Sequence, residues 1–460
     1  METNFFTGKT VLVMGLGHFG GGVDVARFAS QAGANVIVTD LASPKKLANS
    51  IEQLTDCNNI QFHLGEHTNK DFQQADIIVV NPAVKPDNKY LKIAADLNKF
   101  ITSQMNIFFE LCPAHIIAIT GSNGKSTTAA LTTHLLQNTS HGPPATSHES
   151  VWLSGNIGNE PLLCSLDKIT ADDLVVLEVS SFQANQLAQI QKGPEIAMLT
   201  NLTPNHLDMH PTFEDYCNAK ENLFRFQKTD SNSPAVSIFN AEDKIAIEWF
   251  KKYTKDSNRT CIKYRVDDLN EEFRLALPLP GWANLSNLAA AVAIAKYYGV
   301  TDDQIASALP EFKPLPHRLE LVGQYEGVNW YNDSISTTAQ STIAAIEAFD
   351  QPKIIIAGGC DKNTSFDELG KTIAETAKAA ILIGQTAPKI AQAIEKHRFR
   401  ADIVDSLDKA VALAREIAEA GDVVLLSPAC ASYDMFDNFQ DRGDKFQKLV
   451  KLHNSQPPQK

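Results

Sequence analysis

One eight-residue run constrains the fold of this chain more than any other feature. The run from Thr120 to Thr127 reads T-G-S-N-G-K-S-T and stands between the apolar segment Ile116 to Ile119 and a helical pattern. At such a strand-to-helix turn the backbone amides can hold phosphate, Lys125 can reach the terminal phosphates, and a hydroxyl group can bind magnesium. Ile119 stands where the general Walker A spacing requires glycine, so only the shorter form of the motif is complete. The run predicts a phosphate-binding turn whose contacting positions are Gly121, Ser122, Asn123, Gly124, Lys125, Ser126 and Thr127.

A second glycine turn lies near the start of the chain. The segment Gly15 to Gly20 fits G-x-G-x-x-G between a predicted strand, Lys9 to Met14, and a predicted helix, Val23 to Ala32, and Asp40 follows the next strand. Glycines at these positions allow a tight turn close to a diphosphate, and the acidic residue can hold ribose hydroxyls. On this turn alone an NAD-dependent dehydrogenase is a fair interpretation, although any diphosphate nucleotide satisfies the same chemistry.

The length and the order of the predicted elements indicate an α/β protein of three domains. A chain of 460 residues exceeds what one hydrophobic core usually organises. Beyond the proline-rich segment 310–316, four apolar strands alternate with helical patterns, which favours a third, mostly parallel sheet. The predicted domains are a Rossmann-like domain at residues 1–103, a central P-loop ATPase-like parallel sheet at 104–313, and a C-terminal Rossmann-like domain at 314–460.

Charge and cysteine usage narrow the class of partner and the compartment. The formal net charge of -13 disfavours a nucleic-acid partner or a membrane surface, both of which attract basic faces. Every apolar run is interrupted well before the roughly 18 to 20 residues that a membrane span needs. The start of the chain lacks the basic and apolar stretches of a signal peptide, and the seven cysteines include no C-x-x-C pair. We therefore expect a cytoplasmic protein whose anionic ligands are held by local cations, helix N-termini and metal ions.

Two further strand ends carry polar side chains. Glu178 closes the apolar run that begins at Leu174, and His206 follows the predicted strand Ile196 to Thr200. Because parallel strands end at one edge of a sheet, we expect both residues to lie beside the phosphate-binding turn. Lys220 lies on the predicted helix Phe213 to Phe226. The pattern favours a site for a nucleotide and a metal ion.

Together these motifs resemble the Mur ligase family over nearly the whole chain. The last block of the resemblance, with Phe439 and Arg442-Gly443, is typical of the family member that adds glutamate. Besides T-G-S-N-G-K-S-T, Glu178 and Lys220, the blocks that carry the resemblance are S-G-N-I-G at 154–158, S-S-F-Q at 180–183, N-H-L-D at 205–208, residues 281–287, His317-Arg318, N-D-S at 332–334 and S-P-A-C-A-S at 427–432.

The resemblance implies an ATP-dependent amide ligase of peptidoglycan precursor synthesis. Its substrates would be UDP-N-acetylmuramoyl-L-alanine and D-glutamate, and the reaction would pass through an acyl phosphate. The N-terminal glycine turn would then bind UDP in place of NAD. The implied precursor-binding residues are Gly15, Gly17, Asp40, Asn81 and Asn156; those for the amino acid are Lys362, Ser432 and Phe439; those for ATP, besides the turn, are Asn284, Asn287, His317, Arg318 and Asp333.

The resemblance also implies two magnesium sites. Ser126 or Thr127 would hold one Mg2+ together with Glu178. His206 and Lys220 would hold the second, and Lys220 can do so only as an anionic carbamate because an ammonium group does not ligate a cation. Lys125, Glu178, His206 and Lys220 would thus be the catalytic residues. We expect a monomer without an obligate protein partner.

Several alternatives stay open at this point. Ile335 follows the N-D-S block where relatives often carry lysine, which leaves ligation of L-glutamate or another amino acid possible. A folylpolyglutamate synthase shares the phosphate-binding turn, but residues 1–103 count against it. A dehydrogenase leaves residues 120–127 unexplained, and a nucleotide-gated binding protein without ligase activity predicts ATP turnover that is indifferent to the acceptor amino acid.

Overall fold

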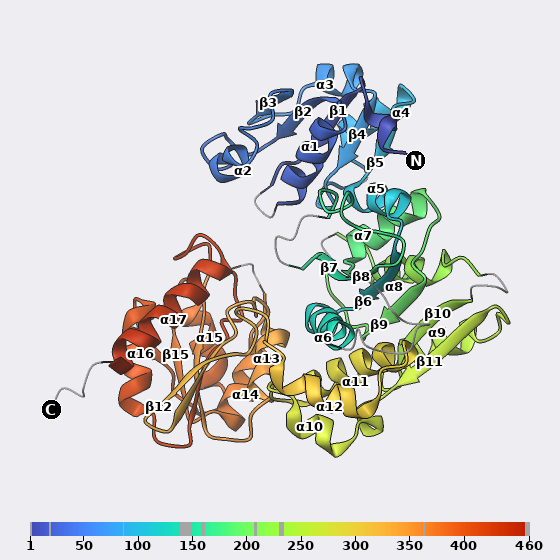
Figure 1. The fold of residues 1–460 in the computed structure, drawn as a ribbon. Helices are drawn as coiled ribbons and strands as arrows, with labels where there is room; N and C mark the ends of the chain where they lie inside the picture. Colours follow the sequence, from blue (N-terminus) through green and yellow to red (C-terminus); the bar gives the residue numbers. More distant parts are fainter. Residues whose placement is uncertain are drawn as a thin grey trace. The chain divides into compact units, whose positions relative to one another are not determined.

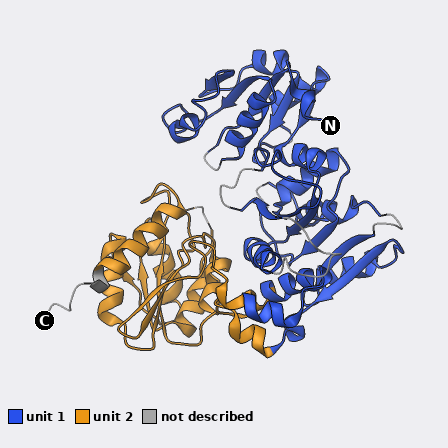
Figure 2. Cartoon of the chain, viewed as in Figure 1, with its two compact units in different colours: residues 1–270, 287–308 blue, residues 271–286, 309–460 orange. Residues whose placement is uncertain are grey.

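The computed structural model describes residues 2–17, 20–85, 87–138, 150–157, 162–206, 209–229, 234–361 and 364–455. The chain divides into two compact units, each of which is described by itself (Figure 2). Unit 1 comprises Met1–Asn270 and Asn287–Ala308, and unit 2 comprises Glu271–Ser286 and Leu309–Lys460. Unit 1 contains two sheets and unit 2 contains one (Figure 1).

The first sheet of unit 1 is parallel, with the order β3-β2-β1-β4-β5. The three central strands, β2, β1 and β4, are rich in β-branched residues and largely buried, and α1 packs against β1 and β2. The strand order reverses between β1 and β4, so the turn after β1 lies where α/β sheets bind ligands. The elements are η1 (Thr3–Phe6), β1 (Thr10–Met14), α1 (Gly21–Gln31), β2 (Asn35–Asp40), α2 (Ala48–Glu52), β3 (Ile60–Leu64), α3 (Asn69–Gln74), β4 (Ile77–Val80), α4 (Lys89–Asp96) and β5 (Phe100–Thr102).

The second sheet of unit 1 is also parallel, with the order β11-β10-β9-β6-β8-β7. Strand β6 lies inside the sheet between β9 and β8, so the turn that follows it meets the ends of both neighbours. The elements are α5 (Gln104–Leu111), β6 (His115–Thr120), α6 (Lys125–Gln137), β7 (Val151–Gly155), β8 (Leu174–Glu178), α7 (Ser181–Gln186), η2 (Leu187–Gln189), β9 (Ile196–Leu199), α8 (Phe213–Arg225), β10 (Ala235–Asn240), α9 (Lys244–Tyr253), β11 (Arg259–Tyr264), η3 (Val266–Asp268) and α12 (Asp302–Ala308).

Unit 2 contains a mixed sheet with the order β12-β13-β17-β14-β15-β16, in which only β12 and β13 pair antiparallel. Apolar clusters cover both faces of this sheet. Helix α11 (Trp282–Tyr297) contributes residues to both units. The other elements are α10 (Glu271–Ala276), η4 (Leu309–Glu311), β12 (Glu320–Tyr325), β13 (Val328–Asn332), α13 (Ala339–Ile346), β14 (Lys353–Ala357), α14 (Asp367–Thr376), β15 (Ala379–Leu382), α15 (Ala387–Glu395), β16 (Asp402–Ile403), α16 (Leu407–Ile417), β17 (Val423–Leu426) and α17 (Phe439–Ser455).

The predicted α/β class with three sheets is confirmed, and most predicted elements differ from the observed ones by one or two residues at an end. The hairpin of β12 and β13 was not predicted. Its turn has positive φ at both Glu326 and Gly327, the backbone of a type I′ turn. The domain limits at residues 103 and 313 stay a prediction. None of the helices in the described ranges combines the length and apolarity needed to cross a membrane.

Asp24 joins the two sheets of unit 1. Its carboxylate on α1 accepts hydrogen bonds from the backbone amides of Leu162, Leu163 and Cys164 at 2.8–3.1 Å. The side-chain amide of Gln104, at the start of α5, donates to the same carboxylate at 2.6 Å. The N-terminal sheet is thereby anchored to the sheet that carries the phosphate-binding turn.

Candidate functional site

The phosphate-binding turn adopts a backbone that requires glycine at two positions. The predicted strand, turn and helix are present, but β6 extends to Thr120 and α6 already begins at Lys125, so the last three residues of the predicted turn are helical. Gly121 has φ +146° and Gly124 has φ +82°, values that side-chain-bearing residues rarely adopt. A Cβ atom would lie 1.9 Å from Thr200 Oγ1 at Gly121 and 2.1 Å from Asn287 Oδ1 at Gly124. The turn therefore packs directly against the end of β9 and against α11.

Residues that the sequence did not single out hold this turn in place. Asn201, just beyond β9, accepts a backbone hydrogen bond from Ser122 at 2.8 Å, and its Oδ1 accepts one from Asn123 at 3.0 Å. The Ser122 hydroxyl lies 3.0 Å from the Tyr216 hydroxyl on α8. Only the position of Asn201 could have predicted this contact, because the residue follows β9, a strand adjacent to β6. The turn is thus rigidly supported before any ligand binds.

Lys125 is the first residue of α6, and its Nζ donates to the carbonyl of Ser122 at 3.0 Å. The lysine therefore folds back over the turn that it follows. Ser126 and Thr127 occupy the first turn of the same helix. The positive end of the helix dipole and the lysine charge together favour an anion at this point.

Glu178 supplies a buried carboxylate at the end of β8. The residue is 2% exposed, and its Oε1 accepts a 3.0 Å hydrogen bond from Asn156 Nδ2. Within the described part of the chain, Oε2 has no hydrogen-bond partner. Buried polar atoms are normally satisfied, and a carboxylate oxygen is a preferred ligand of Mg2+. The open oxygen of Glu178 therefore fits a metal ligand.

The S-G-N and S-S-F-Q blocks have local structural roles around Glu178. Gly155 has φ +99°, and a Cβ there would lie 2.3 Å from the carbonyl oxygen of Glu178. Ser180 and Gln183 form a reciprocal capping box that starts α7 immediately after β8. Both blocks therefore fix the backbone on either side of the carboxylate.

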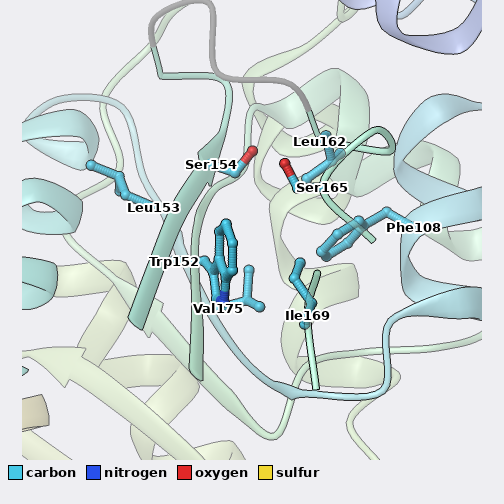
Figure 3. Close-up of a pocket in the computed structure, with 8 residues that line it drawn as sticks. All are labelled: Phe108, Trp152, Leu153, Ser154, Leu162, Ser165, Ile169 and Val175. Atoms are coloured by element: carbon cyan, nitrogen blue, oxygen red, sulfur yellow. The ribbon is translucent and has the colours of Figure 1, made fainter. Parts of the chain in front are cut away.

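A small cavity lies beneath β7 (Figure 3). Its volume is about 50 Å³, and apolar side chains such as Phe108 and Trp152 line it together with Ser154 and Ser165. The Oγ of Ser154 has no hydrogen-bond partner among the described residues. A space of this size has room for one or two water molecules and is too small for a substrate.

Lys220 lies on α8 and is only 1% exposed. Its Nζ donates to Thr120 Oγ1 at 3.3 Å and lies 4.9 Å from the centre of the Tyr216 ring. Burial, followed by the positive charge of Lys125, lowers the pKa of Lys220 well below its ordinary value, and the carboxylate of Glu178 opposes this shift. The structure thus brings Lys220 to the phosphate-binding turn, and burial favours its neutral amine.

His206 lies beyond β9 with φ +54° and an exposed side chain. Its ring centre is 5.1 Å from that of Phe182, which also stacks on His210. Leu207 and Asp208 of the same block lie outside the described residues. Across the described ranges, no group of three or more His, Cys, Asp or Glu side chains could hold a metal ion.

In the N-terminal sheet, Asp40 shapes the glycine turn itself. Its Oδ2 accepts from the backbone amides of Leu16 and Gly17 at 2.8 and 3.1 Å. The side chain of Asn81 packs on the same turn, because a Cβ on Gly15 would lie 2.9 Å from that of Asn81. The predicted roles of these residues toward UDP stay predictions. His18 and Phe19 of the turn lie outside the described residues.

The glycine that packs the first helix onto its strand is Gly22. A Cβ on Gly22 would lie 2.3 Å from the carbonyl oxygen of Leu16, whereas a Cβ on Gly20 would meet nothing within 4 Å. Gly20 instead has φ +83° and precedes α1. The third glycine of the motif thus serves the turn, and Gly22 serves the close packing.

In unit 2, the predicted nucleotide residues gather where β13 ends. Asp333 is 3% exposed and accepts hydrogen bonds from Leu319 N at 3.2 Å and from Ser427 Oγ at 2.8 Å. Burial raises the pKa of Asp333 to about 6. His317 has φ +62°, and its Nδ1 lies 2.9 Å from Asn332 Nδ2. Arg318 follows it in the chain.

The remaining predicted residues lie in both units. In unit 1, Asn287 Oδ1 accepts from Thr128 Oγ1 on α6 at 3.3 Å. In unit 2, Asn284 Nδ2 donates to the carbonyl of Pro280 at 2.7 Å, Ser432 is 2% exposed, and the Phe439 ring lies edge-on to His317. Lys362 lies outside the described residues.

Comparisons with known proteins agree on one family. Residues 9–103 match the MurD-like N-terminal domain of Mur ligases, residues 119–295 the Mur ligase middle domain, and residues 317–430 the Mur ligase glutamate ligase domain. A UDP-N-acetylmuramoylalanine–D-glutamate ligase of Roseiflexus sp. strain RS-1 is 38% identical, and the match covers 96% of this chain and 98% of the relative. The enzyme of the same name from Acetivibrio thermocellus is 37% identical, with 96% of each chain covered.

Solved structures of Mur ligases share the fold. UDP-N-acetylmuramate-alanine ligase from Thermotoga maritima aligns with a TM-score of 0.61 and 16% identity. The alignment covers 97% of this chain and 100% of that chain. The MurF ligase of Thermotoga maritima, solved in complex with ADP, aligns with a TM-score of 0.56 and 17% identity, covering 97% of this chain and 96% of the other. At these identities the likeness concerns the fold alone.

Proposed function

The chain belongs to the Mur ligase family, and from this premise we propose how its residues join D-glutamate to UDP-N-acetylmuramoyl-L-alanine. The activity itself follows from identity along nearly the full length to several D-glutamate ligases. The enzyme is an ATP-dependent amide ligase of peptidoglycan precursor synthesis. Which residues perform each step is the content of the proposal.

The reaction has two chemical steps. In the first, the alanyl carboxylate attacks the γ-phosphorus of ATP, ADP leaves, and an acyl phosphate forms. In the second, the amine of D-glutamate attacks the acyl carbon through a tetrahedral intermediate, and phosphate leaves as the amide forms. Two anions must meet in the first step. Lys125 lowers their repulsion and stabilises the charge that spreads over the transferred phosphoryl group.

Glu178 and one hydroxyl of Ser126 or Thr127 would hold a Mg2+ ion on the nucleotide. The buried Oε2 of Glu178, which lacks a hydrogen-bond partner among the described residues, supports this assignment. His206 and a carbamylated Lys220 would hold a second ion, and the depressed pKa of Lys220 supports it because only a neutral amine adds carbon dioxide. Such ions supply charge neutralisation along the phosphates. Asn156 keeps the carboxylate of Glu178 oriented through its 3.0 Å hydrogen bond.

Substrate recognition is distributed over the three domains at 1–103, 104–313 and 314–460. The glycine turn with Asp40 and Asn81 would receive the UDP part of the precursor. D-glutamate would bind to Lys362, Ser432 and Phe439. The adenine ring would be surrounded by Asn284, Asn287 and His317. The rest of the nucleotide would contact Arg318 and Asp333. We place the reaction in the cytoplasm, as a monomer, where its product supports cell-wall growth, cell shape and division. The seven cysteines, all of them free thiols, agree with a reducing compartment.

One observation carries the proposal: a phosphate-binding turn, a buried carboxylate with an open oxygen and a buried lysine with a depressed pKa meet at one edge of the central sheet. The test measures phosphate release from ATP with the precursor and a panel of amino acids in both enantiomers. We expect release that requires both the precursor and D-glutamate. A preference for L-glutamate would change the assigned enantiomer of the substrate. Phosphate release that does not depend on the precursor would contradict the proposal.

Lys125→Ala tests in the same assay whether turnover depends on the phosphate-binding turn. Removal of the lysine charge should lower kcat by about 100-fold or more, because charge-stabilising groups at developing anions contribute roughly 3 kcal/mol or more. Activity of the variant at the unmodified level would show that turnover does not use this turn.

A further inference from the structure

Arg442, near the start of α17, is fully buried. Its guanidinium Nη1 donates to the carbonyl of Cys430 at 3.0 Å, and Nη2 donates to the carbonyl of Ser334 at 2.8 Å. Its Nε donates to Ser334 Oγ at 3.0 Å. Within the described ranges these acceptors are two backbone carbonyls and a hydroxyl, and none is a carboxylate. A buried cation that gains no ion pair is costly, so its hydrogen bonds require an explanation.

The hydrogen bonds of Arg442 join the ends of two neighbouring strands. Ser334 follows β13, and Cys430 follows β17, which pairs with β13. The Ser334 hydroxyl in turn donates to the carbonyl of Phe439 at 2.8 Å. The rigid fork of a guanidinium holds several acceptors in fixed directions, which a lysine ammonium does not. Arg442 therefore fixes two strand ends and the start of α17 relative to one another.

The segment that Arg442 holds contains a strained residue. Ala429 has φ +60°, a left-handed conformation that costs an L-residue about 1 to 2 kcal/mol. Such strain persists only where surrounding contacts determine the backbone. Here Ala429 N donates to the carbonyl of Ser336 at 3.0 Å, Cys360 N donates to that of Ala431 at 2.8 Å, and Arg442 binds that of Cys430. The segment ends at Ser432.

We propose that Arg442 is a positioning residue for the amino-acid substrate, acting through Cys430 and Ser334 to hold Ser432 and Phe439 in place. This inference rests on the proposed function, in which Ser432 and Phe439 bind D-glutamate. The nucleotide side of the same strand ends is held independently, because Asp333 is fixed by Leu319 and Ser427. Loss of the fork should therefore disturb the amino-acid pocket and spare the step that uses ATP.

The test is Arg442→Lys, which keeps the positive charge and removes the fork. Two quantities are measured. The first is the KM for D-glutamate at saturating ATP and precursor, and the second is the rate of ADP formation in a single turnover without D-glutamate. We expect the KM for D-glutamate to rise roughly tenfold or more, since small misplacements of binding groups are costly. ADP formation in one turnover should stay within about twofold of the unmodified enzyme. An unchanged KM would overturn the proposal, because charge alone would then suffice, and so would an equal loss in both measurements.

Arg259→Lys is the matched control. Arg259 lies in unit 1 and its side chain is likewise buried. Its guanidinium binds Gln227, Ser237 and the carbonyl of Phe224, and it lies 3.7 Å from the carboxylate of Asp256. The same substitution there should leave the KM for D-glutamate unchanged. A rise as large as that of Arg442→Lys would mean that loss of any buried guanidinium disturbs the pocket, which contradicts a local positioning role.

Ser334→Ala keeps the proposal testable if Arg442→Lys does not fold. It removes the hydroxyl that accepts from Arg442 and donates to Phe439 but leaves the arginine in place. We expect the same selective rise in the KM for D-glutamate, and an unchanged KM would overturn the proposal. Failure of the proposed function itself is distinguishable, because the unmodified enzyme would then form no ADP that depends on the precursor.

Discussion

The Nζ of Lys220 lies 3.3 Å from the Oγ1 of Thr120, the residue that ends β6 directly before the phosphate-binding turn. The lysine reaches this point from α8, through the interior, and is almost fully buried. Burial and the nearby Lys125 lower the pKa of this amine, which favours its neutral form. Addition of carbon dioxide would convert it into an anion suited to a metal ion.

Replacement of Lys220 by alanine tests this role. We expect kcat to fall by about 100-fold or more, because the proposed ligand of the second metal ion would be lost and with it the charge stabilisation that the ion supplies. A short carboxylic acid such as acetate should partly restore the rate by taking the place of the carbamate. The measurement is steady-state phosphate release with and without the acid. Carbon-13 NMR of the unmodified enzyme with labelled carbon dioxide should detect the carbamate directly.

Lys252→Ala is the control for this substitution. Lys252 is exposed on α9 and pairs with the buried carboxylate of Glu221, which Arg225 also contacts at 2.8 Å, so Glu221 keeps a cationic partner in the variant. Its rate should be unchanged and insensitive to acetate. An unchanged rate in Lys220→Ala would remove the carbamate hypothesis.

The sequence predicted the central part of the site because that part is local. The strand, turn and helix around Gly121 to Lys125 follow one another in the chain, and glycine is required where the backbone has positive φ. Glu178 was also predictable, because it ends an apolar run in a parallel sheet. The burial of Lys220 was not, since neither its spacing nor its neighbours distinguish it from a solvated helix lysine; only the family resemblance pointed to it.

Contacts between residues far apart in the chain could not be predicted. Asn201 supports the turn across a sequence separation of 78 residues, and Arg442 binds Ser334 across 108. The local contacts of Asp40 were not predicted either. Its position predicts a partner for ribose hydroxyls, which stays a prediction, whereas in the structure its carboxylate holds the amides of Leu16 and Gly17.

The buried carboxylate of Asp333 gives a pH-dependent prediction. Its pKa is about 6, raised by burial from 3.8, so folding favours the protonated form. The contribution of this group is fully present below about pH 4 and is lost as the pH rises through about 6. Asp333→Asn keeps a neutral side chain at every pH. We therefore expect it to stabilise unit 2 at pH 7 by up to about 2 to 3 kcal/mol, with little effect at pH 4.

The measurement for Asp333→Asn is the free energy of unfolding in urea at pH 4 and pH 7. Ser427 is able to adapt, because its hydroxyl also lies 3.0 Å from Thr342 Oγ1 and can donate there while it accepts from the new amide. The same variant should raise the KM for ATP, since the carboxylate is a proposed nucleotide contact. A stability difference that does not change with pH would contradict the raised pKa.

Asp24→Asn tests the anchor between the two sheets of unit 1. The carboxylate accepts from three backbone amides, including those of Leu162 and Leu163, and an asparagine has only one oxygen to offer. Loss of charge-assisted hydrogen bonds at a buried site should lower the free energy of unfolding by about 2 to 3 kcal/mol. The control is Asp56→Asn, which removes an ion pair between an exposed carboxylate and Arg27 and should change the free energy of unfolding far less. An equal decrease in the free energy of unfolding of the two variants would show that the hydrogen bonds of Asp24 stabilise the fold no more than this ion pair does.

Gly124→Ala tests the geometry of the phosphate-binding turn. The new Cβ would lie 2.1 Å from Asn287 Oδ1, and the backbone φ of +82° is strained for alanine. Either α11 or the turn must move, so we expect the KM for ATP to rise roughly tenfold or more. Gly299→Ala is matched in strain, with φ +81°, but its Cβ would meet nothing within 4 Å. It should lower stability by about 1 kcal/mol without changing the KM for ATP, so an equal rise in both variants would assign the effect to general strain and not to the contact with Asn287.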